Sequence, residues 1–306
     1  MDKYAPIVLF AFNRLASLKA CVDALQKNSE AIESDLIVFV DGPRAEKEGE
    51  TQKVQEVRNY VMTITGFKSL TYHFSEKNKK LGPSIIVGVT EVINNYGRAI
   101  VIEDDLIAGK NLLSFLNQGL NVYEDNTDVF SVCGYTNIVG VPKDYPYDAY
   151  FCVRSSSWGW ATWKNRWDTL DWELKDWRSV QQNADAFNKW GGSDCYQMLK
   201  GWKEGRNQSW AIRFCYNQFL QDKVALFPIV SHVDNKGFDG EGTNCKRWSR
   251  YKFVFDQSEN KEFHFPEIVV KNKKIYRDFL KYYSILIRIY SRMMYILYDL
   301  KSVLKI

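Results

Sequence analysis

Histidine is scarce in this sequence, and its cysteines are not paired. The chain has only three histidines in 306 residues, and its six cysteines are scattered without a CxxC pair. No histidine stands at metal-ligand spacing from another histidine or from a cysteine, which argues against a zinc site. A chain of this size needs no disulfides to hold its core, so we expect reduced cysteines and a cytoplasmic protein.

The sequence also lacks the signals of a membrane span, a signal peptide, a Walker loop and a nucleic-acid-binding surface. No stretch reaches the roughly 18 uncharged apolar residues of a membrane-spanning helix, and the N-terminus runs directly into an apolar strand pattern, so we expect no signal peptide. The glycine-rich residues 237–242 lack the Gly-Lys-Ser/Thr ending of a Walker loop. The body of the chain has no basic patch, so we expect no nucleic acid among its partners.

Aromatic residues and C-terminal basic residues are plentiful. Aromatics make up 15% of the chain, with 10 Trp and 18 Tyr, and we expect most Trp in the core and some against sugar rings. From Lys271 to the end, nine Lys or Arg face two Asp, a local charge of +7. Because the whole chain carries +4, the rest carries −3. This asymmetry predicts a basic tail on a slightly acidic body.

The first hundred residues alternate short apolar runs with helical periodicity, which predicts an α/β fold with a mostly parallel sheet and helices on both faces. The expected strands are residues 6–12, 36–40, 70–74 and 99–102, and the expected helices are residues 17–26, 55–64 and 84–94. Further along we expect helices at 111–123, 194–202 and 210–220, strands at 129–133 and 224–227, and a loop at 134–150.

An acidic triplet, Glu103-Asp104-Asp105, directly follows the fourth expected strand. Three consecutive carboxylates repel one another unless a cation or hydrogen bonds compensate their charge. In open parallel sheets, ligands bind at the carboxyl ends of the strands. Mg²⁺ and Mn²⁺ take oxygen ligands, often one or two carboxylates with phosphate oxygens completing the shell. The alternative is a solvated acidic turn at the start of the next helix.

Two further residues follow strands in the same half of the chain. Arg14 follows the first strand and is suited to pair with phosphate or to stack on a base. Asp41 follows the second strand and is suited to accept the imide N–H of uracil. The alternatives are an exposed arginine at a strand end and an Asx turn within Asp41-Gly42-Pro43.

The order of these segments resembles that in GT-A-fold glycosyltransferases, above all the N-acetylglucosaminyltransferase I type and its bacterial polysaccharide-synthesis relatives. The resemblance covers roughly residues 5 to 250. It is carried by Asn13-Arg14, Asp41-Gly42, Lys80-Leu81-Gly82-Pro83-Ser84, Val101-Ile102-Glu103-Asp104-Asp105-Leu106, Ser157-Trp158-Gly159-Trp160-Ala161-Thr162-Trp163, Ser209-Trp210-Ala211-Ile212-Arg213 and the loop at 237–245.

The resemblance implies roles for the matched residues. Asp105 would bind Mn²⁺ or Mg²⁺ directly, Asp104 would lie near the donor ribose or sugar, and Glu103 would orient the donor. Arg14 and Asp41 would contact the nucleoside. The glycine-rich loop near residue 239 would close over the diphosphate as a lid. The segment Trp158-Gly159-Trp160 would wall the sugar and acceptor pocket, and Lys80, Trp210 and Arg213 complete the expected substrate-binding set.

The general base is the point at which the sequence departs from the family pattern. An inverting transferase of this type is expected to have a carboxylate just before the Trp-x-x-Arg step, but Gln208 and Ser209 stand before Trp210. We therefore take Asp194 as the substitute base, followed by Asp239. The alternative for Asp194 is a helix cap.

The tail has helical periodicity from residue 275 to 306. One face carries Arg277, Lys281, Ser284, Arg288 and Arg292, and the other carries Phe279, Tyr283, Leu286, Tyr290, Met293 and Leu297. A basic amphipathic helix of this kind is suited to an anionic membrane surface. The alternative is a terminal helix packed on its own domain or on a second subunit.

These patterns together predict a metal-dependent, inverting hexosyl- or N-acetylhexosaminyltransferase. It would move a sugar from a nucleotide-sugar, most simply a UDP-sugar, to a glycan or lipid-linked glycan in bacterial surface polysaccharide assembly, at the inner face of the cell membrane. Residues 1–265 would form the GT-A-like domain, with a nucleotide-sugar half at 1–133 and an acceptor half at 134–265, and residues 266–306 the tail. The rivals are a nucleotidyltransferase, which would need a glycine-rich loop after the first strand, and a non-catalytic glycan- or membrane-binding relative.

Overall fold

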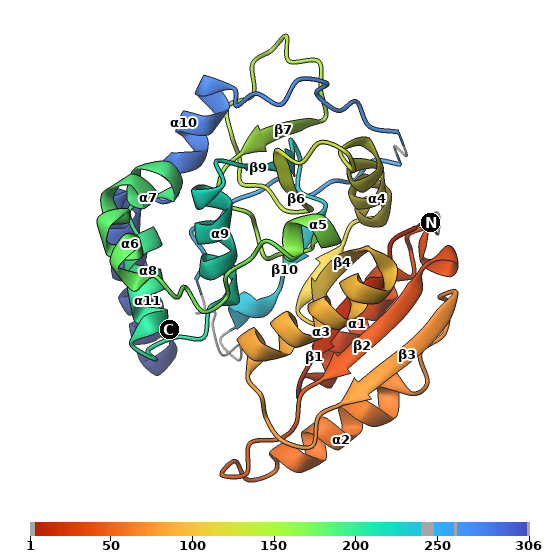
Figure 1. Ribbon diagram of the computed structural model, residues 1–306. Coiled ribbons are helices and arrows are strands. Elements are labelled where there is room, and N and C mark those ends of the chain that lie inside the picture. The colour runs from red at the N-terminus through yellow and green to blue at the C-terminus, as the bar shows by residue number, and fades with distance from the viewer. Residues whose placement is uncertain (1–3, 240–247, 260–261, 305–306) are drawn as a thin grey trace.

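The computed structural model describes residues 4–239, 248–259 and 262–304, and an eight-stranded sheet lies at its centre (Figure 1). The strand order is β3-β2-β1-β4-β8-β6-β9-β7. The first four strands are mutually parallel, and β6 and β9 are parallel to each other, whereas β8 and β7 run antiparallel to their neighbours. The strands are β1 (Ile7–Ala11), β2 (Asp35–Val40), β3 (Ser69–Phe74), β4 (Arg98–Glu103), β6 (Val129–Cys133), β7 (Ala149–Cys152), β8 (Trp160–Trp163) and β9 (Val224–Pro228). The expected α/β class with a mostly parallel sheet is confirmed.

Helices cover both faces of the sheet, which explains the continuous apolar strand runs. Alternate residues of β1 face opposite layers: Leu9 packs in the cluster that includes α1, α2 and α4, whereas Phe10 packs in the cluster of α3 and α9. These helices are α1 (Leu15–Leu25), α2 (Glu50–Val61), α3 (Leu81–Tyr96), α4 (Leu112–Val122) and α9 (Trp210–Leu220). The remaining ones are α5 (Lys164–Trp167), α6 (Trp177–Gln182), α7 (Ala184–Gly191), α8 (Cys195–Lys203), α10 (Lys273–Lys281) and α11 (Ile285–Leu304), with short 3₁₀ turns η1 (Ala31–Glu33) and η2 (Gly237–Asp239).

Two strands lie where the sequence pattern indicated a loop or a pocket wall. The Trp-dense segment contains β8, which lies between β4 and β6 in the middle of the sheet. The end of the expected loop at 134–150 enters β7, the edge strand beside β9. Both strands are fully buried, so their apolar side chains complete the core.

A second, two-stranded sheet lies next to the acidic triplet. Its strands are β5 (Leu106–Ala108) and β10 (Val233–Asn235), which pair antiparallel. This pairing brings the start of the glycine-rich loop back to the carboxyl end of β4. Among the helices of the described residues, none is both long enough and apolar enough to cross a membrane.

Candidate nucleotide-sugar site

The candidate site lies where the strand order of the sheet reverses. The chain moves from β1 outward to β2 and β3, and then returns to place β4 on the other side of β1. The carboxyl ends of β1 and β4 therefore border a topological switch point, the position at which open α/β sheets bind ligands. Arg14 follows β1 and the acidic triplet ends β4, so the topology brings them together. Their charged groups lie 3.6 Å apart, from Arg14 Nη1 to Asp105 Oδ2.

The three carboxylates lie in a confined space. Asp104 is fixed across the end of β1: its backbone N–H donates to the Phe10 carbonyl at 3.0 Å, and its Oδ2 accepts from the Phe12 N–H at 3.3 Å. Burial, and then the neighbouring Asp105, raises the pKa of Asp104 to about 7. Burial and the charges of Asp105 and Asp104 also raise the pKa of Glu103 well above its ordinary value. The cluster therefore holds its negative charge at a free-energy cost that a cation would offset.

We expect the stability of the protein without divalent cations to fall as pH rises through about 7. A carboxyl group whose pKa is raised in the folded state favours folding at low pH, and this advantage is lost when the group ionises at Asp104's value of about 7. Thermal unfolding of wild type and Asp104→Asn from pH 5.5 to 8 measures this, because the variant should gain stability relative to wild type as pH rises. Added Mg²⁺ should reduce the difference. A constant difference across this range would contradict the account.

The segment after β10 packs directly against Asp105. The Lys236 N–H donates to the Asp105 carbonyl at 2.9 Å, and the Gly237 N–H donates to Asn235 Oδ1 at 2.7 Å. A Cβ on Gly237 would lie 2.2 Å from Asp105 Oδ2 and 3.0 Å from Asn235 Oδ1. Glycine is required here because Asp105 and Asn235 both approach its backbone, and Asn235 is a candidate oxygen donor that the sequence motifs did not indicate.

Gly237→Ala should weaken cation-dependent nucleotide binding by about tenfold, because the new methyl group displaces the carboxylate of Asp105 from its position. Isothermal titration calorimetry measures the affinity. Lys236→Ala is the matched control, since that side chain is 63% exposed and pairs with Asp234, not with Asp105. Equal affinities for both variants and wild type would show that the close approach to Asp105 has no role in binding.

Asp41 ends β2 and organises the segment that leads into α3. Its Oδ1 accepts from the backbone N–H groups of Gly42 and Lys79 at 2.9 and 2.8 Å, and its Oδ2 accepts from that of Lys80 at 3.0 Å. Lys80 has a positive φ of 67° and is exposed. The Asx turn is therefore formed, and the Asp41 carboxylate also accepts hydrogen bonds from Lys79 and Lys80. The role of Asp41 toward uracil stays a prediction.

The glycine of the Lys80-Leu81-Gly82 segment permits a close contact with the start of α9 and the residues before it. A Cβ on Gly82 would lie 2.2 Å from the carbonyl oxygen of Gln208 and 3.8 Å from Nη2 of Arg213. Arg213 is buried, donates from Nη1 to the Trp172 carbonyl at 2.8 Å, and lies over the Trp202 ring at 4.6 Å. The structure thus brings Arg213 to Gly82 in the first turn of α3, two residues after Lys80 in the sequence.

Glu50 connects the loops after β1 and β2, and the sequence analysis missed it. Its side chain is buried and accepts from the backbone and the guanidinium of Arg44 and from Asn13 Nδ2, the last at 3.0 Å. The hydrogen bond from Arg44 is the main reason that the pKa of Glu50 is lowered. Because Glu50 is separated from Asn13 by 37 positions, local motifs gave no signal for this contact.

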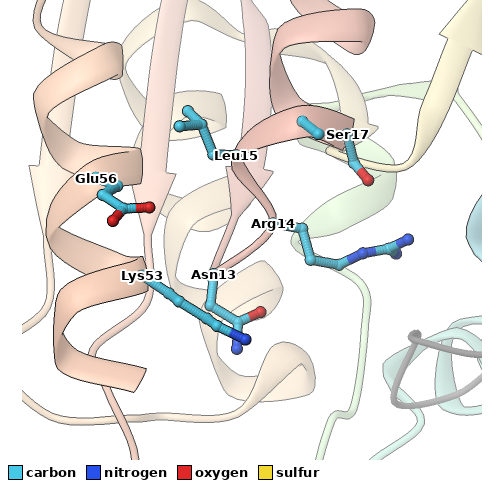
Figure 2. Close-up of a pocket in the computed structure, with 7 residues that line it drawn as sticks. Asn13, Arg14, Leu15, Ser17, Lys53 and Glu56 are labelled. Carbon is cyan, nitrogen blue, oxygen red and sulfur yellow. The ribbon is translucent and has the colours of Figure 1, made fainter. Parts of the chain in front are cut away.

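An open hollow of about 530 Å³ lies beside the end of β1. Figure 2 shows Lys53 extending from α2 toward Asn13, whereas the side chain of Arg14 points to the other side of the β1–α1 connection. The hollow is lined by Asn13, Arg14, Leu15, Ala16, Ser17, Lys53 and Glu56. Lys53 and Arg14 thus lie on opposite sides of the connection, and Arg14 is the one that faces Asp105.

The oxygen atoms at this site suit a hard divalent cation that takes its remaining ligands from a substrate. Asp105 has a side chain that is 18% exposed, and the Asn235 oxygen lies nearby. Within the described residues, no three His, Cys, Asp or Glu side chains converge as a preformed metal cage. Mg²⁺ and Mn²⁺ commonly bind one or two protein carboxylates together with phosphate oxygens, and this arrangement suits such a site.

The tryptophans expected at the pocket separate into two groups. Trp158 is partly exposed and contacts Phe238, the residue after Gly237, with ring centroids 5.7 Å apart. Trp160 and Trp210 are 1% and 4% exposed and stack on each other at 4.9 Å within the core beside α3 and α9. Trp158 therefore lies beside the loop at Asp105, whereas Trp160 and Trp210 are core residues. The structure buries both rings, and their expected part in binding the sugar stays a prediction.

The expected base Asp194 lies in a buried ion pair. Its carboxylate receives two hydrogen bonds from the Arg154 guanidinium, at 2.5 and 3.1 Å, and its side chain is 9% exposed. Burial alone would raise the pKa of Asp194, but the charges of Arg154, Arg250 and Arg288 hold it below its ordinary value. A carboxylate so paired is poorly suited to accept a proton, so the structure does not favour Asp194 as the base. Asp239 ends η2, and its side chain lies outside the described part of the chain.

Comparison with known proteins gave structural likenesses only. No family model matches the chain, and no curated protein matches it. The structure is similar to S. aureus TarS, with 11% identity, a TM-score of 0.39, and coverage of 74% of this chain and 35% of that one. For TarS 1-349 the identity is 11%, the TM-score 0.38, and the coverage 74% and 58%. A structure described as a nucleotide-diphospho-sugar transferase from Desulfovibrio desulfuricans G20 has 12% identity, a TM-score of 0.32, and coverage of 61% and 77%. This chain thus spans about a third of the length of the first TarS chain and somewhat over half of the length of TarS 1-349.

Proposed function

We propose that this protein is a nucleotide-sugar-dependent glycosyltransferase. The observation that carries the proposal is the acidic triplet at the β1/β4 switch point, facing Arg14 across 3.6 Å and covered by the Gly237 segment. Carboxylates with raised pKa values beside an arginine, at the ligand-binding edge of a parallel sheet, suit a diphosphate held with a cation. The resemblance of the ordered motifs to GT-A-fold enzymes supports the same function.

The reaction is a single displacement at the anomeric carbon of the donor. The acceptor hydroxyl forms a bond to this carbon, the bond from the carbon to the diphosphate oxygen breaks, and the nucleoside diphosphate leaves. Asp105, with Asn235 beside it, would hold Mn²⁺ or Mg²⁺, which when bound supplies positive charge next to the departing diphosphate. Arg14 contributes a fixed positive charge at the same edge.

Asp239 is our proposed base, which takes the proton from the acceptor hydroxyl. It is two residues from Gly237, whose backbone packs against Asp105, and this short separation along the chain supports the proposal. Trp158, beside Phe238, is our proposed wall for the sugar. A UDP-sugar donor, a glycan or lipid-linked glycan acceptor, and a cytoplasmic location stay part of the proposal.

Product analysis in the absence of acceptor separates this function from its two rivals. A glycosyltransferase should slowly hydrolyse its nucleotide-sugar with Mn²⁺ present, releasing nucleoside diphosphate and free sugar. Release of pyrophosphate from a nucleoside triphosphate and a sugar phosphate would instead indicate a nucleotidyltransferase. Nucleotide-sugar binding without turnover, with acceptor glycans present as well, would indicate a non-catalytic relative.

A further inference from the structure

The C-terminal tail consists of two helices that present different faces to the body. The sequence pattern predicts one helix with a continuous apolar face, but the structure breaks it at residues 282–284. In α10 the apolar face points inward: Ile275 and Phe279 are 0% and 1% exposed, and Phe279 contacts Phe227 of β9 at 5.3 Å. This helix is an ordinary terminal helix packed on its own sheet.

In α11 the polar groups hold the helix to the body. Arg288 donates from Nη1 to the carbonyl oxygen of Ser193 at 2.8 Å and to its hydroxyl at 3.1 Å. Ser291 is 2% exposed, with Ile287 and Met294 half-buried beside it. Figure 1 shows α11 next to the α6–α8 group, at the side of the molecule opposite β3. The contacts of Arg288 and the burial of Ser291 therefore define which side of α11 faces the protein.

The apolar stripe of α11 points away from the body. Leu286 is 75% exposed, Met293 57% and Ile296 60%. A helix on a globular protein normally turns its apolar stripe toward the core, so this orientation is the reverse of the usual one. Large apolar side chains that lie exposed along one face of a helix mark an interaction site. The stripe consists of Ile285, Leu286, Ile289, Tyr290, Met293, Ile296 and Leu297, all between 49% and 75% exposed, and the Tyr290 ring also contacts Trp248.

We propose that this α11 stripe lies in the surface of an anionic lipid bilayer. Charge selects this occupant: the sequence of α11 has Arg288, Arg292 and Lys301 against Asp299 alone, within a tail of charge +7. An apolar stripe on a helix of net positive charge gains both from burial among acyl chains and from attraction to anionic headgroups. A second copy of α11 would bring the same positive charge against it, which opposes pairing through this face.

Docking through α11 fixes how the catalytic body meets the membrane. Arg288 joins α11 to Ser193, at the start of α8, and the Tyr283 ring lies 3.9 Å from the guanidinium of the buried Arg154. The rings of Tyr290 and Tyr295 both contact Trp248, with centroids 5.7 and 5.6 Å apart. These contacts join the segments around Arg154, Ser193 and Trp248 to the tail, so docking through α11 would hold this side of the protein at the lipid surface.

Vesicle flotation of the full-length protein tests the proposal. The wild type should bind phosphatidylcholine vesicles that contain phosphatidylglycerol and bind pure phosphatidylcholine vesicles more weakly. Leu286→Glu/Met293→Glu should lose at least about tenfold in affinity, because two apolar side chains no longer enter the bilayer. Ile268→Glu/Val270→Glu is the matched control, since those side chains are 75% and 65% exposed but lie outside α11. Arg292→Gln should lose about fivefold on anionic vesicles only.

Equal binding by the α11 variant and the control variant would overturn the proposal, as would no binding of wild type to anionic vesicles. A wild-type dimer in sedimentation velocity that is lost in Leu286→Glu/Met293→Glu, together with absent vesicle binding, would assign the stripe to a second copy instead. Flotation measures partition and not turnover. Its failure therefore leaves the transferase proposal intact, and inactive protein that still floats would leave the docking proposal intact.

Discussion

Asp105→Ala should reduce the turnover of nucleotide-sugar by at least about 100-fold while the protein stays folded. Asp105 is the partly exposed carboxylate of the triplet, facing Arg14 and touching the Gly237 segment. The substitution removes the side chain that would hold the cation against the diphosphate. Losing one such electrostatic contact with the leaving group typically lowers the rate by about 10²–10³. Steady-state release of nucleoside diphosphate with Mn²⁺ present measures the effect, and circular dichroism verifies the fold.

Asp125→Ala is the control for this substitution, because Asp125 is an exposed aspartate outside the site. It should keep wild-type turnover. Unchanged turnover in Asp105→Ala would remove the triplet from the reaction. A loss of the same size in both variants would indicate a general effect of charge on the assay.

Asp194→Ala should lower the free energy of unfolding by about 3 kcal/mol. The substitution leaves the Arg154 guanidinium buried, 10% exposed, without the carboxylate that neutralises it. Because the pKa of Asp194 is lowered, the stabilisation from this pair is present at neutral pH and is lost as pH falls below the ordinary carboxyl range. Chemical denaturation at pH 7 measures the change.

A double variant separates a structural role of Asp194 from a catalytic one. Arg154→Leu/Asp194→Leu should be less destabilised than the sum of the two single variants, because it leaves no unpaired buried charge. Donor hydrolysis per folded molecule should remain in Asp194→Asn. Normal stability with a selective loss of turnover in Asp194→Asn would restore Asp194 as the base.

The sequence predicted the elements whose signals are local. The strands β1, β2 and β4 lie close to their expected bounds, and β6 and α9 have the bounds that were expected. Continuous apolar stretches and helical periodicity are properties of neighbouring residues, so the sequence shows them directly. The strand β8 was missed because Trp160 and Trp163, on opposite faces of a central strand, produce a Trp-rich pattern that also suits a sugar pocket.

The site was predicted only in part, for a similar reason. The triplet and Arg14 each follow an apolar strand, so the parallel topology brings them together and the sequence indicates the cluster. Asn235 reaches Asp105 through the pairing of β10 with β5, a contact between segments about 130 positions apart that no local pattern indicates. The direction of the α11 stripe likewise depends on a break at residues 282–284 that helical periodicity does not show.

Calorimetric titration of the wild-type protein with UDP, GDP, CMP and ADP, with and without Mn²⁺, tests the central claim most directly. The account predicts that one of these nucleotides binds, that binding requires Mn²⁺, and that Asp105→Ala abolishes it, which would also identify the base of the donor. Absence of binding by every nucleotide with Mn²⁺ present would contradict the assignment of the β1/β4 edge as a nucleotide-sugar site.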